Sequence, residues 1–218
     1  MAFTSLPYFV YDKPGHHPAL APRLGLQDGV SWSDIVHALD RRDAAYKLLY
    51  VARHGEGYHN LAESKYGTDA WNLHLAQQCG DDDMVWGPDP FLTPLGEQQA
   101  AAVHDAFADE LQRADAPPLP NVFCSSPLSR SLDTLHGTWR GIVPRNTPVH
   151  VYEGLREVLG KHTCDRRASR HTIERRFSRH GIFPLHFSMP FEEEDMLWSP
   201  IRETDDAMRT RVLNALTS

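Results

Sequence analysis

A short apolar run that ends abruptly in charged residues is the feature that most limits how this chain can fold. Residues 46–52 (Tyr-Lys-Leu-Leu-Tyr-Val-Ala) are rich in strand-forming side chains and too few for a typical helix, so they predict a buried strand. Arg53, His54 and Gly55 follow directly, and glycine lets the backbone turn sharply because it has no Cβ. A polar cluster is therefore expected at the carboxyl end of an interior strand.

Helix-like and strand-like segments alternate after this run. Thr93 suits an N-cap and Pro94 a first helical position, and apolar residues then recur every four positions to about residue 113. Two more short strands are expected at 121–125 and 149–152, with a helix opening at Ser126 between them. This alternation predicts an α/β fold with a mostly parallel central sheet and helices on both faces.

The last part of the chain is less regular. Residues 161–200 are expected to be an irregular stretch in which a basic, helix-like segment (166–179) pairs with the acidic run 192–195. A capped helix is expected from Thr204. Its buried face is predicted to carry Met208, Val212 and Leu216.

The chain is expected to hold one compact domain, residues 44–218, behind an N-terminal extension, residues 1–43. A short amphipathic helix opens in the extension at Ser31 or Ser33. Its predicted buried stripe is Ile35, Val36 and Leu39.

Composition excludes several classes of function. A net charge of -7 argues against nucleic acid as a partner. No apolar run approaches the roughly 20 residues that a membrane span needs, so no membrane association and a cytoplasmic location are expected. Three cysteines without a C-x-x-C pair and 13 histidines without a ligand spacing argue against a disulfide framework and a metal cofactor. The sequence does not determine the oligomeric state.

Three polar clusters fall at the ends of the expected strands: 53–54, 125–130 and 153–157. Ligands of open α/β sheets bind beyond the carboxyl ends of the strands. Arginine side chains suit phosphate because the guanidinium donates paired hydrogen bonds, and the helix at Ser126 would add free N–H groups. A neutral histidine could attack phosphorus, and a carboxylic acid could protonate the leaving oxygen. The partner expected from this chemistry is a small phosphorylated or otherwise anionic molecule.

These residues resemble a known family. The Arg-His-Gly-Glu motif at 53–56, with Asn60 six residues after the histidine, resembles the signature of the histidine phosphatase superfamily, which includes phosphoglycerate mutases and many phosphatases. Residues 87–96 and 125–130 resemble its next two blocks in order. Residues 155–167 are similar to a fungal phosphoglycerate-mutase-like subgroup. A lone Arg-His-Gly is weak evidence, whereas this ordered set is specific and covers the chain from Tyr46 onward.

The resemblance implies a metal-independent reaction without a cofactor. His54 would become a phosphohistidine, Arg53 and Arg130 would clamp the phosphoryl oxygens, and Glu157 would act as general acid and then as base. Neighbouring carboxylates, Glu153 and Asp165, remain alternatives for the acid. The residues assigned to the substrate pocket and its rim are Glu56, Asn60, Thr93 and Gly96.

One departure from the family pattern limits this expectation. The family carries a second histidine in a His-Gly pair on a strand after the last helix, and this sequence stops at Ser218. Residues 179–181 (Arg-His-Gly) are a poor replacement because no apolar strand precedes them. The domain is therefore expected either to be truncated and lack its last strand, or to have been repurposed.

The expected function is a phosphomonoester phosphatase for a small phosphorylated metabolite, impaired if that histidine is missing. The alternatives are a non-hydrolytic biosynthetic enzyme or anion-binding protein that reuses the pocket, or a phosphomutase.

Overall fold

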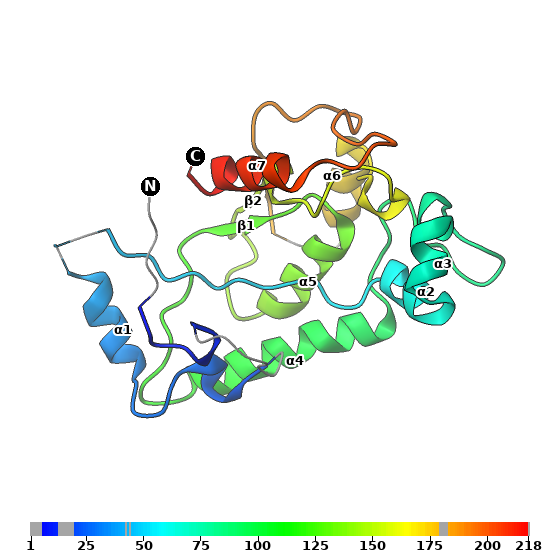
Figure 1. The fold of residues 1–218 in the computed structure, drawn as a ribbon. Helices are drawn as coiled ribbons and strands as arrows, with labels where there is room; N and C mark the ends of the chain where they lie inside the picture. Colours follow the sequence, from blue (N-terminus) through cyan, green and yellow to red (C-terminus); the bar gives the residue numbers. More distant parts are fainter. Residues whose placement is uncertain (1–5, 13–19, 42, 44, 179–182, 218) are drawn as a thin grey trace. The chain divides into compact units, whose positions relative to one another are not determined.

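The computed structural model describes residues 6–12, 20–41, 43, 45–178 and 183–217 (Figure 1). The chain divides into two compact units. The first consists of Met1–Ala52 and Ala102–Asn121, and the second of Arg53–Ala101 and Val122–Ser218. The domain boundary predicted after residue 43 stays a prediction. Within the described ranges, no helix is both long and apolar enough to cross a bilayer.

Helix α1 (Trp32–Leu39) of the first unit begins where the sequence predicts. Ser31 is its N-cap: the Ser31 hydroxyl accepts a hydrogen bond from Asp34 N at 3.1 Å, and the Asp34 carboxylate accepts one from Ser31 N at 2.9 Å. The buried stripe differs from the prediction, because Val36 is 39% exposed. The buried residues are Trp32, Ile35 and Ala38, at positions i, i+3 and i+6, and Leu39 is half-buried.

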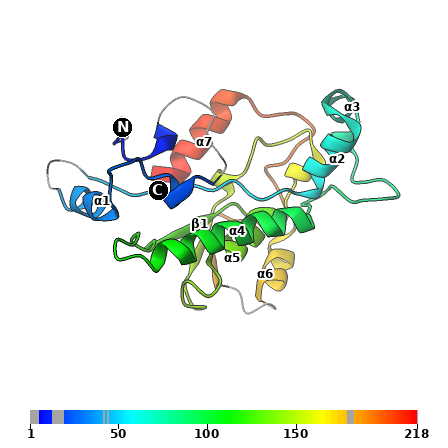
Figure 2. The same cartoon turned by 90° about the horizontal axis from the view of Figure 1, so that it is seen from below.

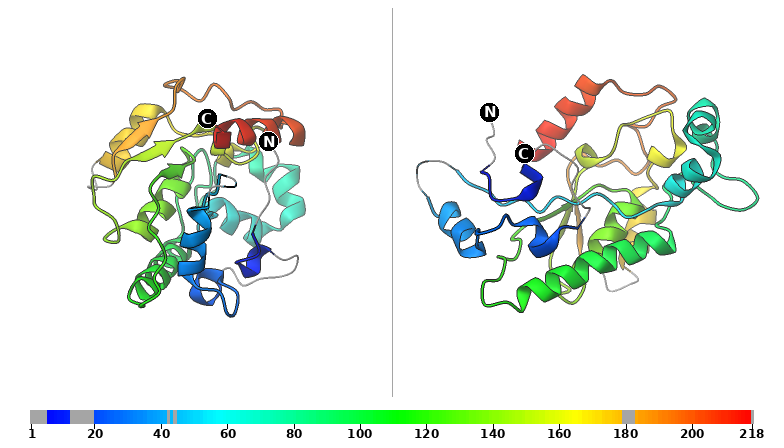
Figure 3. Two further views of the ribbon diagram at one scale, coloured as in Figure 1. Left: turned by 90° about the vertical axis from the view of Figure 1, so that its left-hand side faces the viewer. Right: turned by 60° about the horizontal axis from the view of Figure 1, so that its bottom comes forward.

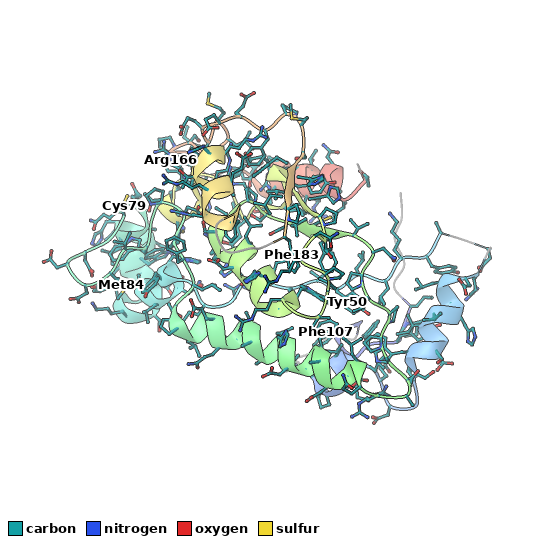
Figure 4. All side chains as sticks on the ribbon, turned by 180° about the vertical axis from the view of Figure 1, so that it is seen from behind. Tyr50, Cys79, Met84, Phe107, Arg166 and Phe183 are labelled. Atoms are coloured by element: carbon teal, nitrogen blue, oxygen red, sulfur yellow. The ribbon has the colours of Figure 1, made fainter. Side chains whose placement is uncertain are left out.

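The core of the first unit surrounds Trp32. The Trp32 indole N–H donates to Glu110 Oε1 at 3.0 Å, so its polar edge is satisfied while the ring is buried. Tyr50 and Phe107 point toward each other, with ring centroids 5.4 Å apart in an edge-on arrangement (Figure 4). Aromatic packing therefore holds the extended segment before Arg53 against the end of helix α4 (Pro94–Leu111).

The prediction of a buried strand at 46–52 is wrong. Described residues 45–52 form neither a strand nor a bridge, and Leu49 and Val51 are 67% and 87% exposed. Alternate side chains, Leu48 and Tyr50, pack against the cluster around Trp32. The segment therefore has the two-residue period of a strand, but no neighbouring strand pairs with it in the described chain. Strand propensity in the sequence does not show whether such a partner strand exists.

The second unit contains a three-stranded parallel sheet in the order β1-β2-β3. Strands β1 (Phe123–Ser125) and β2 (Val149–Val151) confirm the two later strand predictions. Helix α5 (Ser129–Trp139) lies on one side of the sheet and helix α7 (Asp205–Thr217) on the other (Figures 1 and 2). The predicted α/β class with a parallel sheet is confirmed.

Strand β3 (Leu185–Phe187) was not predicted, because it lies inside the stretch expected to be irregular. It pairs in parallel with β2, and Val149 stands opposite Leu185. Figure 3 shows the sheet from two further sides. The signal in the sequence is the alternation of Phe183, Leu185 and Phe187, which is too short to separate a strand from a loop.

The helices of the second unit follow local signals. Thr93 caps α4 as predicted, since its hydroxyl accepts a hydrogen bond from Gly96 N at 3.1 Å. In α7, Met208 and Val212 are half-buried as expected, whereas Leu216 is 56% exposed and its predicted burial is wrong. The other helices of the second unit are α2 (Tyr58–Tyr66), α3 (Thr68–Leu73) and α6 (Arg170–Ser178).

The predicted pairing of the basic and acidic stretches is confirmed, but mostly through backbone. Arg167 is 3% exposed and donates to the carbonyl oxygens of residues 192, 193 and 194 at 2.7, 3.1 and 3.0 Å. It also pairs with Glu153 at 2.5 Å. Asp195, at the end of the acidic run, pairs with Arg156 at 2.6 Å, and Arg156 lies in the turn that follows β2. These arginines fasten residues 192–195 to the turn that follows β2.

We expect Arg167→Met to lower the free energy of unfolding by about 3–5 kcal/mol, because it leaves a buried carboxylate and several carbonyl groups unpaired. Urea unfolding measures this change. Arg175→Met, at an exposed position of α6, is the control and should change stability by less than about 0.5 kcal/mol. Equal unfolding midpoints for the two variants would contradict the role assigned to Arg167.

Candidate active site

His54 is buried at the start of the second unit. Its side chain is 4% exposed, and Nδ1 lies 2.6 Å from the carbonyl oxygen of Gly55. A carbonyl oxygen only accepts, so Nδ1 carries a proton, and in the neutral ring Nε2 then keeps its lone pair. Nε2 is buried and makes no hydrogen bond to any residue that the structure describes. This tautomer leaves the nitrogen that a phosphohistidine requires free to react.

Arg130 lies in the first turn of α5 with its side chain fully buried. One terminal nitrogen, Nη1, donates to the carbonyl oxygen of Cys164 at 2.8 Å. The other, Nη2, pairs with Glu157 at 2.6 Å and with Asp165 at 3.5 Å. A buried guanidinium is therefore paired with two carboxylates, as a buried charge must be.

Glu157 connects Arg130 to His54. Its Oε2 accepts from Arg130, and its Oε1 lies 3.5 Å from His54 Nε2. Burial alone would raise the pKa of Glu157, but the charge and the hydrogen bond of the Arg130 guanidinium oppose it, and that pKa lies below its ordinary value. Glu157 is thus a carboxylate in this arrangement.

The alternative acids lie in other environments. Glu153 pairs with Arg156 at 3.0 Å and with Arg167 at 2.5 Å. Its carboxylate is therefore engaged by the arginines that hold residues 192–195. Asp165 pairs with Arg130 and, at 2.6 Å, with Arg202. Glu157 is the carboxylate that faces His54, so the geometry favours it for proton transfer over both neighbours.

Arg211 of α7 holds the turn that carries Glu157. Its Nη1 donates to the carbonyl oxygens of residues 153, 154 and 156 at 3.4, 3.0 and 3.1 Å. Its Nη2 donates to the carbonyl oxygen of Glu157 at 3.0 Å. The guanidinium also pairs with Glu203. No pattern in the sequence marked Arg211, because its role depends on how α7 packs.

Thr134 joins the His54 loop to α5. Its hydroxyl accepts from Gly55 N at 3.0 Å and donates to the carbonyl oxygen of Arg130 at 2.8 Å. One side chain therefore fixes the two strongest candidates, His54 and Arg130, relative to each other. Sequence reasoning missed Thr134 because threonine inside a helix is common and carries no signal of its own.

His59 is a second histidine beside His54 that the sequence interpretation did not single out. The two rings lie 5.4 Å apart, and His59 is 7% exposed. A Cβ on Gly57 would lie 2.7 Å from the His59 ring, so the glycine makes room for this inward orientation. Burial first, and then Arg130, lower the pKa of His59 to about 2, so its ring is neutral.

The predicted rim residues Glu56, Thr93 and Gly96 lie where the His54 loop packs against the start of α4. Glu56 accepts a hydrogen bond from the Thr93 hydroxyl at 2.7 Å through its carboxylate. A Cβ on Gly96 would lie 2.1 Å from the Glu56 carbonyl oxygen, and one on Gly55 would lie 2.4 Å from the Gly96 carbonyl oxygen. Glycine at both positions lets the loop pack directly on the first turn of α4. Their role in substrate binding stays a prediction.

Asn60 accepts a hydrogen bond from Gly57 N at 3.0 Å and so stabilises the first turn of α2. Its role in the substrate pocket stays a prediction. The helix after β1 begins at Ser129 rather than Ser126, and Asp89 already accepts from Ser129 N at 2.8 Å. That donor is therefore not free for an anion, which corrects the expected contribution of the helix terminus.

Arg53 is exposed, and it has no hydrogen bond or ion pair with the rest of the described chain. It is thus available for an anion from solvent, although its role as a second clamp stays a prediction. Residues 179–181, the weak substitute for the second histidine, lie outside the described residues. His59 is the histidine that the described chain brings next to His54.

Comparison with known proteins identifies the family. Residues 49–217 match the family model of the histidine phosphatase superfamily (branch 1). The chain belongs to the histidine phosphatase superfamily. This confirms the predicted resemblance. The matched residues include His54, Arg130 and Glu157.

Curated fungal proteins are identical to this chain at more than a third of the aligned residues. It is 38% identical over 188 residues to a probable phosphoglycerate mutase of Arthroderma benhamiae, covering 83% of this chain and 54% of that protein. It is 36% identical over 202 residues to a probable phosphoglycerate mutase of Saccharomyces cerevisiae, covering 85% and 68%. The chain thus spans between about half and two thirds of these relatives. A crystal structure of ecdysone phosphate phosphatase from Bombyx mori, in complex with tungstate, matches with 20% identity and a TM-score of 0.44 over 76% of this chain and 63% of that one.

The Glu157 pair makes stability depend on pH. Because the folded-state pKa lies below the ordinary value of 4.5, the pair stabilises the fold above that pH and is lost as the pH falls below it. We expect the urea midpoints of the wild type and Glu157→Gln to converge as the pH falls through this range. The side chain is 43% exposed, so solvent screening keeps the effect small.

Glu192→Gln is the control, because Glu192 is exposed and only its backbone is used in the fold. Its midpoint should keep a constant offset from the wild type over the same range. A constant offset for Glu157→Gln as well would contradict the ion pair.

Proposed function

We propose that the chain is a phosphomonoester phosphatase that acts on a small phosphorylated metabolite through a phosphohistidine at His54. The observation that carries the proposal is the buried Nε2 of His54, which has no hydrogen-bond partner in the described chain, beside the paired Arg130 and Glu157. These three groups supply a nucleophile, an anion clamp and a proton carrier, which are the parts that phosphoryl transfer to histidine requires.

The first step forms the bond between His54 Nε2 and phosphorus and breaks the bond between phosphorus and the ester oxygen. Glu157 in its acid form gives its proton to that oxygen, so the alcohol leaves neutral. In the second step water attacks the phosphohistidine, Glu157 takes a proton from the water, and the N–P bond breaks to release phosphate. Both steps balance without a metal or an oxidant.

Substrate binding has to change the protonation of Glu157, because the carboxylate form cannot donate. Arg130 Nη2 is the group that holds this carboxylate at 2.6 Å. A phosphoryl dianion that takes hydrogen bonds from Arg130 competes with Glu157 for the same cation, and its own negative charge disfavours a second anion beside it. Both effects raise the pKa of Glu157, so phosphate binding creates the acid that the first step needs.

The similar fungal proteins are described as probable phosphoglycerate mutases, which makes a mutase the closest variant of this proposal. A mutase returns the phosphoryl group of His54 to another hydroxyl of the substrate instead of to water. It therefore needs contacts that retain a second phosphoryl group. Exposed Arg53 is the candidate for such a contact.

The proposal predicts an acid-labile phosphate on His54 after incubation with a generic aryl phosphate. His54→Ala should abolish the label and reduce turnover by at least about 10³-fold, since the nucleophile is lost. His74→Ala, at an exposed position outside the site, should change neither. Absence of both label and turnover, in this chain and in a form lengthened at its C-terminus, would contradict the proposal.

Glu157→Gln distinguishes an acid from a carboxylate that only holds Arg130. We expect hydrolysis of an alkyl phosphate to fall by about 10²-fold or more, because its leaving oxygen must be protonated. An aryl phosphate has a good leaving group and should be affected much less. Equal losses for both substrates would assign Glu157 a positioning role instead.

A non-hydrolytic, anion-binding role is the second candidate, because Glu157 as a carboxylate has no proton to give to a leaving oxygen. In that case phosphate binds to the Arg130 region without chemistry at His54. Phosphate binding that is unchanged in His54→Ala, together with no turnover, would select this alternative.

A further inference from the structure

We propose that His54, His59 and Glu157 form a binding site for a divalent transition-metal ion, Zn²⁺ being the best fit, and that the bound ion blocks the nucleophile. This site goes beyond the phosphatase proposal, because binding of the ion does not depend on phosphatase activity. Four properties of these three side chains support the site: nitrogen atoms without partners, spacing, ligand type and charge.

The first property is a pair of buried nitrogen atoms without partners. His54 Nε2 and His59 Nδ1 are both buried, and neither has a hydrogen-bond partner in the described part of the chain. Most buried polar groups are paired, so an unpaired one is unfavourable and is a candidate for a ligand. The two rings that carry these atoms have centroids 5.4 Å apart.

The second property is spacing. One nitrogen from each histidine and a Glu157 carboxylate oxygen all lie within 4.8 Å of one another. Ligands at about 2.0–2.1 Å from a tetrahedral zinc ion are about 3.3–3.4 Å apart. His54 Nε2 and Glu157 Oε1 already have this spacing at 3.5 Å. The His59 nitrogen lies within 4.8 Å of both atoms and completes the set of three.

The third property is the type of ligand. Two imidazoles with one carboxylate are a donor set of zinc, cobalt, nickel and iron, whereas magnesium and calcium prefer oxygen ligands alone. Three protein ligands also leave a coordination position open for water or an anion. Glu157 is 43% exposed, so an ion can reach the site from solvent along this side chain.

The fourth property is charge. The positive charge of Arg130 would repel a metal ion unless carboxylates neutralise it. Its charge is shared between Glu157 and Asp165 at 2.6 and 3.5 Å, so it is not an unpaired cation. Glu157 uses Oε2 for Arg130 and keeps Oε1 toward His54. Glu157 Oε1 and the unpartnered nitrogens of His54 and His59 are therefore the atoms that an ion would meet.

A second cluster, His162, Cys164 and Asp165, has a similar spacing but weaker ligands. Both oxygens of Asp165 are engaged, one by Arg130 at 3.5 Å and one by Arg202 at 2.6 Å. Burial also raises the pKa of the Cys164 thiol, which disfavours the thiolate that binds metal. The His54 site is therefore the better of the two.

Occupancy has a direct chemical consequence. The lone pair that binds the ion is the one that would attack phosphorus, so metal and phosphoryl group exclude each other on His54 Nε2. Zinc should therefore inhibit the phosphatase reaction reversibly, and a chelator should restore it.

Cobalt is the probe, because Co²⁺ takes zinc sites and is coloured. Metal-free chain titrated with Co²⁺ should reach one equivalent and show the visible bands of tetrahedral or five-coordinate cobalt. His59→Ala should weaken binding by at least about 100-fold, since even outer-sphere changes cost about 10–100-fold. Glu157→Gln should weaken it as well, and as a half-exposed position it tests the site if His59→Ala does not fold. His74→Ala and Cys164→Ser are the controls and should bind as the wild type does.

The proposal is overturned by no cobalt binding in the wild type, by unchanged binding in both His59→Ala and Glu157→Gln, or by loss in Cys164→Ser alone. None of these measurements uses turnover. A chain that binds cobalt without hydrolysing phosphates would support the metal site and contradict the phosphatase, so the two proposals fail separately.

Discussion

The pairing of one buried guanidinium organises the second unit. A charge as fully buried as Arg130 is costly unless carboxylates and carbonyl groups surround it. Its partners lie in residues 157–165, so this segment has to fold over the start of α5. Thr134 then ties the same helix to the loop of His54. The position of His54 therefore follows from the pairing of the Arg130 guanidinium.

The sequence predicted the elements whose signals are local. The capping box at Ser31, the cap at Thr93 and the apolar strand β2 each lie within a few residues of the structure they specify. Residues 46–52 misled because a strand requires a neighbour, and propensity does not report one. Strand β3 was missed because three residues are too few to establish a period.

The site residues that belong to sequence motifs could be predicted. Those whose position depends on packing could not. His54, Arg130 and Glu157 follow from a motif order and meet in space as expected. His59 does not, since its inward orientation depends on the space above Gly57. The expected helix donor failed for the same reason, because Asp89 reaches it from a distant part of the chain. Nonlocal contacts thus decide which polar groups remain available to a ligand.

Glu157 decides between the two kinds of occupant that the site can take. As a carboxylate it neutralises Arg130 and offers an oxygen toward His54, which suits a cation and disfavours a phosphoryl dianion. Once protonated, it releases Arg130 for an anion, gains the proton that a leaving oxygen needs, and becomes a poor metal ligand. The two states differ by one proton and one ion pair. Under the two proposals, phosphate chemistry and metal binding at His54 are therefore opposite outcomes of the same equilibrium, and each ligand would shift the protonation of Glu157 in its own favour.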